Sequence, residues 1–137
     1  MRLKQADALA FWRRVLVTSL HRQDPDLTVR QMALLLTVYT MQGPHTVRGL
    51  AESLKISKPA VTRALDRLGE LDFVRRKRDE ADRRNVLVQR TVKGAVFLSD
   101  FAATVTAAVE AVLAEPSPEN RPEDLGPGPS GSAAERD

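Results

Sequence analysis

The stretch from residue 46 to residue 90 constrains the fold of this chain more than any other. Apolar residues recur at helical spacing in two places, first at Leu50, Ala51 and Leu54, and then at Val61, Leu65, Leu68 and Leu71. Only Lys55 and Ile56 separate these two patterns, so a sharp turn must join two short helices. Ser57 is a favourable N-cap, and Pro59 falls in the first turn, where its missing N–H is tolerated. The second helix is therefore expected to begin at Ser57.

This second helix keeps its apolar residues on one side and presents a polar, basic face made of Lys58, Pro59, Thr62, Arg63, Asp66 and Arg67. An arginine such as Arg63 can bond to O6 and N7 of guanine, and the hydroxyl and methyl groups of Thr62 suit phosphate or thymine. The small Ala60 would permit close approach to a groove. The pattern predicts a recognition helix, although a solvent-exposed face on an ordinary helical hairpin is the alternative for a basic amphipathic helix taken alone.

Two basic strand candidates follow, Phe73–Arg78 and Asn85–Arg90, on either side of a short charged loop. A helix-turn-helix followed by a basic hairpin is the arrangement of a winged helix, whose helix enters the major groove and whose hairpin reaches a phosphate or the minor groove. The predicted fold class is mainly α with a small β-hairpin wing (α+β). The candidate DNA-binding residues are Ser57, Lys58, Pro59, Ala60, Thr62, Arg63, Arg67, Arg76, Arg78, Arg83 and Arg84.

The wing residues resemble a known family. The run Asp79–Val88, followed by Thr91–Gly94, is similar to the wing of MarR-type transcriptional regulators, and residues 57–68 resemble their recognition helix. The similarity extends over residues 28 to about 105. The chain departs from the pattern at Lys55, where many helix-turn-helix units have a glycine in a left-handed turn.

The resemblance implies roles for three wing residues. In the family, an aspartate and an arginine two residues later pair across the wing and stiffen it, which maps onto Asp82 and Arg84. A wing arginine enters the minor groove, and the matching candidates are Arg83 and Arg84. The resemblance also implies dimerisation through N- and C-terminal helices, and a small phenolic or aromatic effector.

Two flanking helices with apolar stripes are expected outside the winged helix. Residues 4–22 form the first, and a helix that Thr91 can cap runs to residue 114. Pairing these helices with those of a second chain would bury both stripes. The predicted dimerisation residues are Leu9, Trp12, Leu16, Phe97, Phe101, Val105 and Val109. We also interpret Trp12 and Tyr39 as core residues, with a ligand pocket as the alternative.

The predicted organisation has four parts: an N-terminal dimerisation helix and linker (1–27), a winged helix-turn-helix (28–90), a C-terminal dimerisation helix (91–114) and a disordered acidic tail (115–137). Thr28 and Gln31 have the spacing of a capping box, which predicts a further helix from about residue 29 to residue 42. The last 23 residues hold six acids against two arginines, so residues 1–114 carry +7 although the whole chain carries +3. This charge favours a polyanionic partner.

Several functions are not expected. The chain contains no cysteine, and its two imidazoles, His21 and His45, do not share a metal-ligand spacing. We predict no cofactor, no bound metal and no enzymatic activity, because no nucleophile or phosphate-loop motif is present. No stretch is expected to be long or apolar enough to span a bilayer, and no secretory signal is visible, so we predict a cytoplasmic protein that makes no membrane contact.

We therefore predict a DNA-binding transcriptional regulator, a repressor, that binds a pseudo-palindromic site on double-stranded DNA as a homodimer. The alternative is a winged-helix module that mediates protein–protein assembly without specific DNA binding. The sequence identifies neither the operator nor the effector.

Overall fold

The computed structural model describes residues 3–114, and the predicted tail of residues 115–137 lies outside them. The described chain divides into two compact units. One contains residues 3–24 and 101–114, and the other contains residues 25–100. The long helix α5 (Val92–Ala114) contributes its first part to the second unit and its later part to the first. The expected fold class, mainly helical with a small winged sheet, is confirmed.

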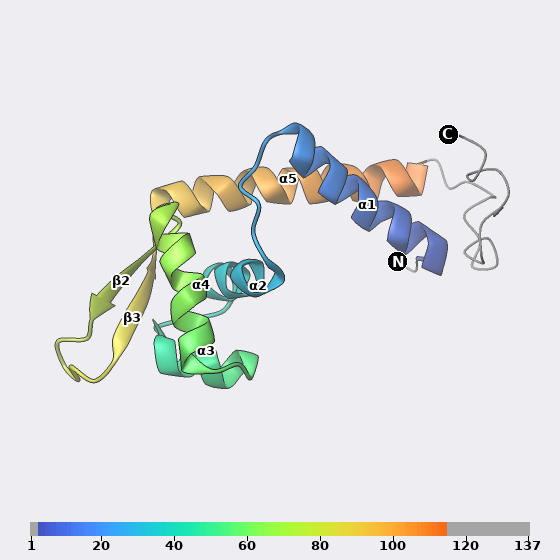
Figure 1. The fold of residues 1–137 in the computed structure, drawn as a ribbon. Helices are drawn as coiled ribbons and strands as arrows, with labels where there is room; N and C mark the ends of the chain where they lie inside the picture. The colour runs from blue at the N-terminus through green and yellow to red at the C-terminus, as the bar shows by residue number, and fades with distance from the viewer. Residues whose placement is uncertain (1–2, 115–137) are drawn as a thin grey trace, which may run out of the picture. The chain divides into compact units, whose positions relative to one another are not determined.

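The second unit contains the helix-turn-helix and the wing (Figure 1). Its elements are α2 (Val29–Thr40), β1 (His45–Thr46), α3 (Val47–Leu54), α4 (Lys58–Glu70), β2 (Val74–Arg78) and β3 (Val86–Arg90), followed by the start of α5. The three strands form one antiparallel sheet in the order β1-β3-β2. We did not predict β1, in which His45 pairs with Val88, because two residues are too few to show strand periodicity.

Side-chain caps begin the helices of this unit, including the predicted caps at Ser57 and Thr91. Thr28 and Gln31 form both bonds of a capping box, at 3.1 and 2.9 Å. The hydroxyls of Thr46 and Ser57 accept the N–H groups of the third helical residues of α3 and α4, at 2.9 and 3.2 Å. The hydroxyl of Thr91 does the same for α5, at 2.9 Å. Each of these bonds satisfies a first-turn N–H that has no partner within its own helix.

The turn between α3 and α4 uses a left-handed residue that is not glycine. Lys55 has φ 57° and ψ 43°, a conformation that costs a non-glycine residue about 1 kcal/mol. The next residue, Ile56, donates its N–H to the carbonyl of Ala51 at 3.1 Å and packs its side chain against the core. This hydrogen bond and the apolar contact form a helix-terminating motif that offsets the strain at Lys55.

The core of the second unit lies where α2, α3, α4 and the base of the wing meet. The largest fully buried side chains include Leu34, Leu35, Leu65 and Leu68. From the chain after α4, Phe73 stacks on Phe97 of α5 with ring centroids 4.5 Å apart. The buried residues are Leu34, Leu35, Val38, Leu50, Ala51, Val61, Ala64, Leu65, Leu68, Phe73, Val74 and Val88.

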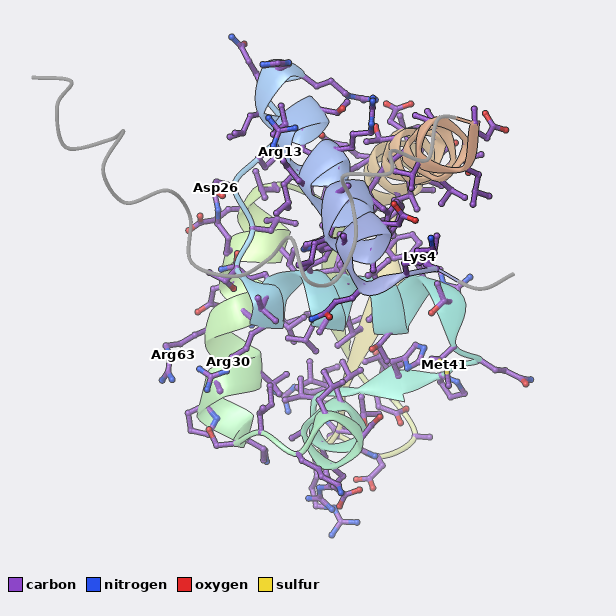
Figure 2. The ribbon with its side chains drawn as sticks, turned by 90° about the vertical axis from the view of Figure 1, so that its right-hand side faces the viewer. Lys4, Arg13, Asp26, Arg30, Met41 and Arg63 are labelled. Atoms are coloured by element: carbon purple, nitrogen blue, oxygen red, sulfur yellow. The ribbon has the colours of Figure 1, made fainter. Side chains whose placement is uncertain are left out.

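In the first unit, α1 (Gln5–His21) lies beside the later part of α5 (Figures 1 and 2). Val15 on α1 and Ala108 and Val112 on α5 are buried. Trp12, which we predicted to be a core residue, is 49% exposed. That prediction is wrong within one protomer. Trp12 does not share the buried face of Val15 but lies on an apolar stripe of α1 with Leu9, Leu16 and Leu20, all of which are exposed.

The expectation that no stretch is long or apolar enough to span a bilayer is also wrong. Helix α5 has 23 residues, and an 18-residue stretch of it has a mean hydropathy of 1.7, which meets both conditions. Alanines, namely Ala102, Ala103 and Ala107, occupy much of its exposed side in place of charged residues, and this raises the mean hydropathy. A core helix of a soluble protein passes the same test, and Phe97 and Leu98 of α5 pack against the core of the second unit.

Candidate nucleic-acid interface

Helix α4 separates a buried face from a polar one, as predicted. Val61, Ala64, Leu65 and Leu68 are buried. The opposite face exposes Lys58, Pro59, Thr62, Arg63 and Asp66, with the N-cap Ser57 also exposed. Because α4 carries this face along its first turns, its N-terminal half can present several donors to a groove at once.

Ala60 is the exception among the predicted contact residues. Its side chain is only 7% exposed and belongs to the buried side of α4. Ala60 lies in the first turn, four residues before the buried Ala64, so the two methyl groups share a helix face. We therefore remove Ala60 from the candidate surface.

An ion pair links the recognition helix to the wing. Nη2 of Arg76 on β2 lies 2.7 Å from Oδ1 of Asp66 on α4. Arg67, which is half-buried, lies 3.7 Å from Glu70 within α4. We predicted Arg76 from the sequence as a DNA contact, but we did not predict its bond to Asp66 on α4.

The wing loop is organised by its own side chains and backbone. Nε of Arg84 donates to Oδ1 of Asp82 at 3.0 Å, and its Nη2 donates to Oδ2 at 3.1 Å. At the loop margin, Nη1 of Arg78 donates to the carbonyl oxygen of Arg83 at 2.6 Å. The expected pairing of Asp82 with Arg84 is therefore present. Arg78 uses one of its donors to hold the loop backbone.

Electrostatics favour the charged forms of this pair. Hydrogen bonds from the side chain and backbone N–H of Arg84 hold the pKa of Asp82 below its ordinary value, and the nearby charge of Arg48 acts in the same direction. The carboxylate of Asp82 in turn raises the pKa of Arg84. Both groups are fully charged at neutral pH.

Comparison with known proteins gives the same fold. YusO from Bacillus subtilis is 24% identical, with a TM-score of 0.68 over 84% of this chain and 79% of that one. An S. aureus MepR–DNA complex is 22% identical, with a TM-score of 0.60 over 76% and 87% of the two chains. A mutant of Lactococcus lactis ZitR is 31% identical, with a TM-score of 0.56 over 66% and 61%. No curated protein sequence matches the chain.

Residues 27–86 match the model of the MarR family. The chain therefore contains a domain that matches the MarR family. The matched residues contain the helix-turn-helix and most of the wing, which are the segments on which the sequence resemblance rested.

The MarR-family domain exposes basic residues that sequence reasoning missed. Arg30 lies in the first turn of α2, and Figure 2 shows it projecting on the same side as Arg63. Arg48 lies in the first turn of α3, close enough to the wing loop to lower the pKa of Asp82. No local pattern distinguishes these two arginines from other exposed ones, because only the packing of α2, α3 and the wing brings them near the predicted contacts.

The predicted dimerisation residues, which lie outside the matched domain, have different environments. Leu9, Trp12 and Leu16 on α1 are exposed. Phe101, Val105 and Val109 on α5 are half-buried. Phe97 differs, because its ring stacks on Phe73 in the second unit. We therefore reassign Phe97 to the core, since helical spacing alone cannot show which residues of a stripe face the helix's own domain.

Two open depressions lie on the second unit. One, of about 320 Å³, is lined by Gly43–His45 and Leu87–Arg90. The other, of about 650 Å³, lies between the end of α4 and β2, where Asp66, Glu70 and Asp72 face Arg75 and Arg76. In the described residues, no group of three His, Cys, Asp or Glu side chains could hold a metal ion.

Proposed function

We propose that this protein is a sequence-specific DNA-binding transcriptional regulator that represses by occupying a pseudo-palindromic operator as a homodimer. The observation that carries the proposal is the exposed face of α4, with Lys58, Thr62 and Arg63 at its N-terminal half, next to an ordered basic wing. One of the solved structures with this fold, S. aureus MepR, is bound to DNA.

The two elements would make different kinds of contact. Arg63 has the length and the fork of donors to read a guanine edge, whereas Lys58 and Ser57 lie at the helix start, where a phosphate is favoured. The wing residues Arg83 and Arg84 would contact phosphate or the minor groove. Contacts to base edges give sequence specificity, and contacts to phosphates give affinity for any duplex.

The charge of the chain supports a polyanionic partner. Residues 1–114 carry +7, and several arginines are concentrated on α4, β2 and the wing loop. Such a surface attracts duplex DNA from a distance and retains it through released counterions.

The proposed dimer uses the exposed apolar stripe of α1. Leu9, Trp12, Leu16 and Leu20 are each about half exposed or more in one protomer. An exposed stripe of this size is typical of a surface that a partner covers. Two recognition helices related by a two-fold axis would then enter major grooves about 34 Å apart.

The rival function is a winged-helix module that mediates protein–protein assembly. The two functions differ in whether the exposed face of α4 is used. Fluorescence anisotropy with a duplex from the region upstream of the protein's own gene, and with a scrambled duplex, would separate them. The double variant Lys58→Ala/Arg63→Ala should lose the preference for the specific duplex. Arg13→Ala/Arg14→Ala removes the same charge from α1 and should keep that preference.

The family resemblance also implies a small aromatic effector that relieves repression. A melting screen with small phenols and aromatic acids tests this part of the proposal. A ligand that raises the melting temperature and also releases the specific duplex supports it. A ligand that stabilises the protein without changing DNA affinity argues against a regulatory role.

A further inference from the structure

The wing strands β2 and β3 meet at the base of the hairpin, which is the end opposite the loop. Val74 on β2 pairs with Arg90 on β3 in the last register position of the hairpin. Beyond this pair, the chain runs back to α4 through Phe73 and forward to α5 through Thr91. Contacts that fix Phe73 and Thr91 therefore set the direction in which the hairpin projects.

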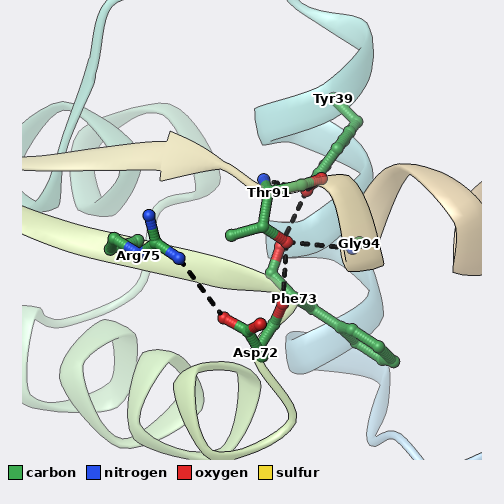
Figure 3. A network of polar contacts seen from close by, with 6 residues as sticks. All are labelled: Tyr39, Asp72, Phe73, Arg75, Thr91 and Gly94. Atoms are coloured by element: carbon green, nitrogen blue, oxygen red, sulfur yellow. Dashed lines mark hydrogen bonds and ion pairs between the residues drawn. The ribbon is translucent and has the colours of Figure 1, made fainter.

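A single side chain on α2, that of Tyr39, contacts both Phe73 and Thr91 (Figure 3). The hydroxyl of Tyr39 donates to the carbonyl oxygen of Phe73 at 2.8 Å and accepts the N–H of Thr91 at 2.8 Å. The carbonyl oxygen of Thr91 lies 3.1 Å from the same hydroxyl. A phenol has one proton and can also accept, so both kinds of bond are available to it. Tyr39 is half-buried, which strengthens these bonds relative to water.

Arg90 reinforces the attachment of β3 to α2. Its Nε donates to the carbonyl of Val38 at 2.8 Å, and its Nη2 donates to that of Met41 at 3.2 Å. Its guanidinium carbon also lies 5.6 Å from the centroid of the Tyr39 ring. The carbonyls at a helix C-terminus carry partial negative charge, so a cation there is favourable.

The start of α5 packs on the same point. The hydroxyl of Thr91 donates to the carbonyl of Asp72 at 2.7 Å and accepts the N–H of Gly94 at 2.9 Å (Figure 3). A Cβ atom at Gly94 would overlap the Tyr39 hydroxyl and the Phe73 carbonyl. Only a residue without a side chain lets the first turn of α5 approach so closely.

The wing tip, by contrast, is ordered by contacts within its own loop, namely the Asp82–Arg84 pair and the Arg78 bond to Arg83. We propose that the Tyr39 hydroxyl is a positioning group that sets the direction of the wing relative to the recognition helix. This inference rests on the proposed DNA-binding function. The hydroxyl does not touch DNA, and it acts through the strands that it holds.

Because the wing is long, a small rotation at its base displaces its tip by a large distance. Arg84 lies six residues before Arg90, which corresponds to about 20 Å of extended strand, so a rotation of about 10° at the base would move the tip by about 3 Å. A displacement of this size exceeds the distance range of a hydrogen bond. Loosening the base should therefore weaken DNA binding by the wing while the recognition helix still binds.

The test compares Tyr39→Phe with Thr37→Val. Thr37 is also half-buried on α2, but within residues 3–114 its hydroxyl donates along its own helix, to the carbonyl of Ala33 at 2.7 Å. The probe is a duplex that the wild-type protein selects from a random-sequence pool, titrated at several salt concentrations. Tyr39→Phe should bind about tenfold more weakly, and its log-log salt slope should fall by about 1 for each phosphate that the wing no longer reaches. Thr37→Val should keep the wild-type slope.

A double-mutant cycle separates positioning from general destabilisation. In an Arg83→Ala/Arg84→Ala background the two arginines of the wing loop are already absent, so adding Tyr39→Phe should weaken binding less than it does in the wild-type protein. The inference would be overturned if the binding free-energy losses of Tyr39→Phe and Arg83→Ala/Arg84→Ala added fully. It would also be overturned if Tyr39→Phe and Thr37→Val had equal log-log salt slopes.

Amide hydrogen exchange distinguishes this inference from the proposed function. Tyr39→Phe should speed exchange in β2 and β3 while leaving α3 unchanged, and Thr37→Val should not. If the wild-type protein selects no duplex, the proposed function fails, and exchange alone then decides whether Tyr39 holds the wing. Unchanged exchange in β2 and β3 would show that it does not.

Discussion

The carboxylate of Asp82 and the guanidinium of Arg84 form a two-point pair, with Nε–Oδ1 and Nη2–Oδ2 distances of 3.0 and 3.1 Å. The backbone N–H of Arg84 also donates to Oδ1, at 3.2 Å. One acid therefore fixes both the side chain and the backbone of the residue two positions later. Exposed ion pairs add little to global stability, so the consequence of this pair lies in the order of the loop.

We expect Asp82→Ala to weaken DNA binding although it makes the protein more basic. Loss of the carboxylate frees Arg84 and disorders the loop that presents Arg83. Glu80→Ala is the matched control, because it removes the same charge from an exposed position of the same loop. Salt-dependent anisotropy measures both variants. If Asp82→Ala bound at least as tightly as Glu80→Ala, long-range charge would outweigh loop order.

The pH dependence of the wing follows from the lowered pKa of Asp82. The hydrogen bonds from Arg84 favour the ionised carboxylate, so its contribution is complete above the ordinary value of 3.8. It is lost as the pH falls through the lower pKa of the folded protein. An NMR titration of the Asp82 carboxyl should show a midpoint below 3.8. In Arg84→Gln the midpoint should move back up, and an unchanged midpoint would mean that Arg84 is not the cause.

Arg63→Ala should relax sequence discrimination. Removing a base-reading arginine costs about 1–3 kcal/mol of binding free energy and acts at one position of each half-site. Arg13→Ala, which removes an equal charge from α1, is the control (Figure 2). Binding to a duplex library measures the preference at each position. A uniform loss across all sequences would assign Arg63 to a phosphate instead.

Gly94→Ala should destabilise the protein. The added methyl group meets the Phe73 carbonyl and the Tyr39 hydroxyl, and overpacking of this kind costs about 1–3 kcal/mol. At Gly69, an exposed position of α4, an added Cβ meets nothing within 4 Å. Gly69→Ala should therefore be neutral or stabilising by up to about 1 kcal/mol. Urea denaturation compares the two, and equal stabilities would show that α5 can shift to accept the methyl group.

Leu16→Glu should dissociate the proposed homodimer. The change places a charge in the exposed apolar stripe of α1, where a partner would have to desolvate it. Val29→Glu, at a more exposed position on α2, is the control for an added surface acid. Sedimentation velocity at low micromolar concentration should give a monomer for the first variant and a dimer for the second. A monomeric wild type would remove the basis of this prediction.

Much of the winged helix could be predicted because its determinants are local. Thr28, Thr46, Ser57 and Thr91 each cap a helix through a bond to a residue three positions later. A cap and the apolar spacing that follows lie within one stretch of chain, and they act before any tertiary contact forms. The pairing of Asp82 with Arg84 is similarly short in range, which is why a family resemblance located it.

The candidate site was less predictable where its members come from different elements. Ala60 and Arg63 lie on the same helix, but the packing of α4 decides that one is buried and the other exposed. The pair between Asp66 and Arg76 depends on how β2 folds back beside α4. Neither residue carries a local signal that names its partner.

The sequence by itself determined where the helices and the hairpin begin and end, because capping bonds and apolar periodicity act between residues a few positions apart. Only the tertiary structure decided what joins them. The Tyr39 hydroxyl meets Thr91 52 positions later in the chain, and Gly94 must be a glycine because that contact occupies the space of a side chain. Contacts over such separations depend on the packing of the whole unit, so the sequence pattern around each residue does not contain them.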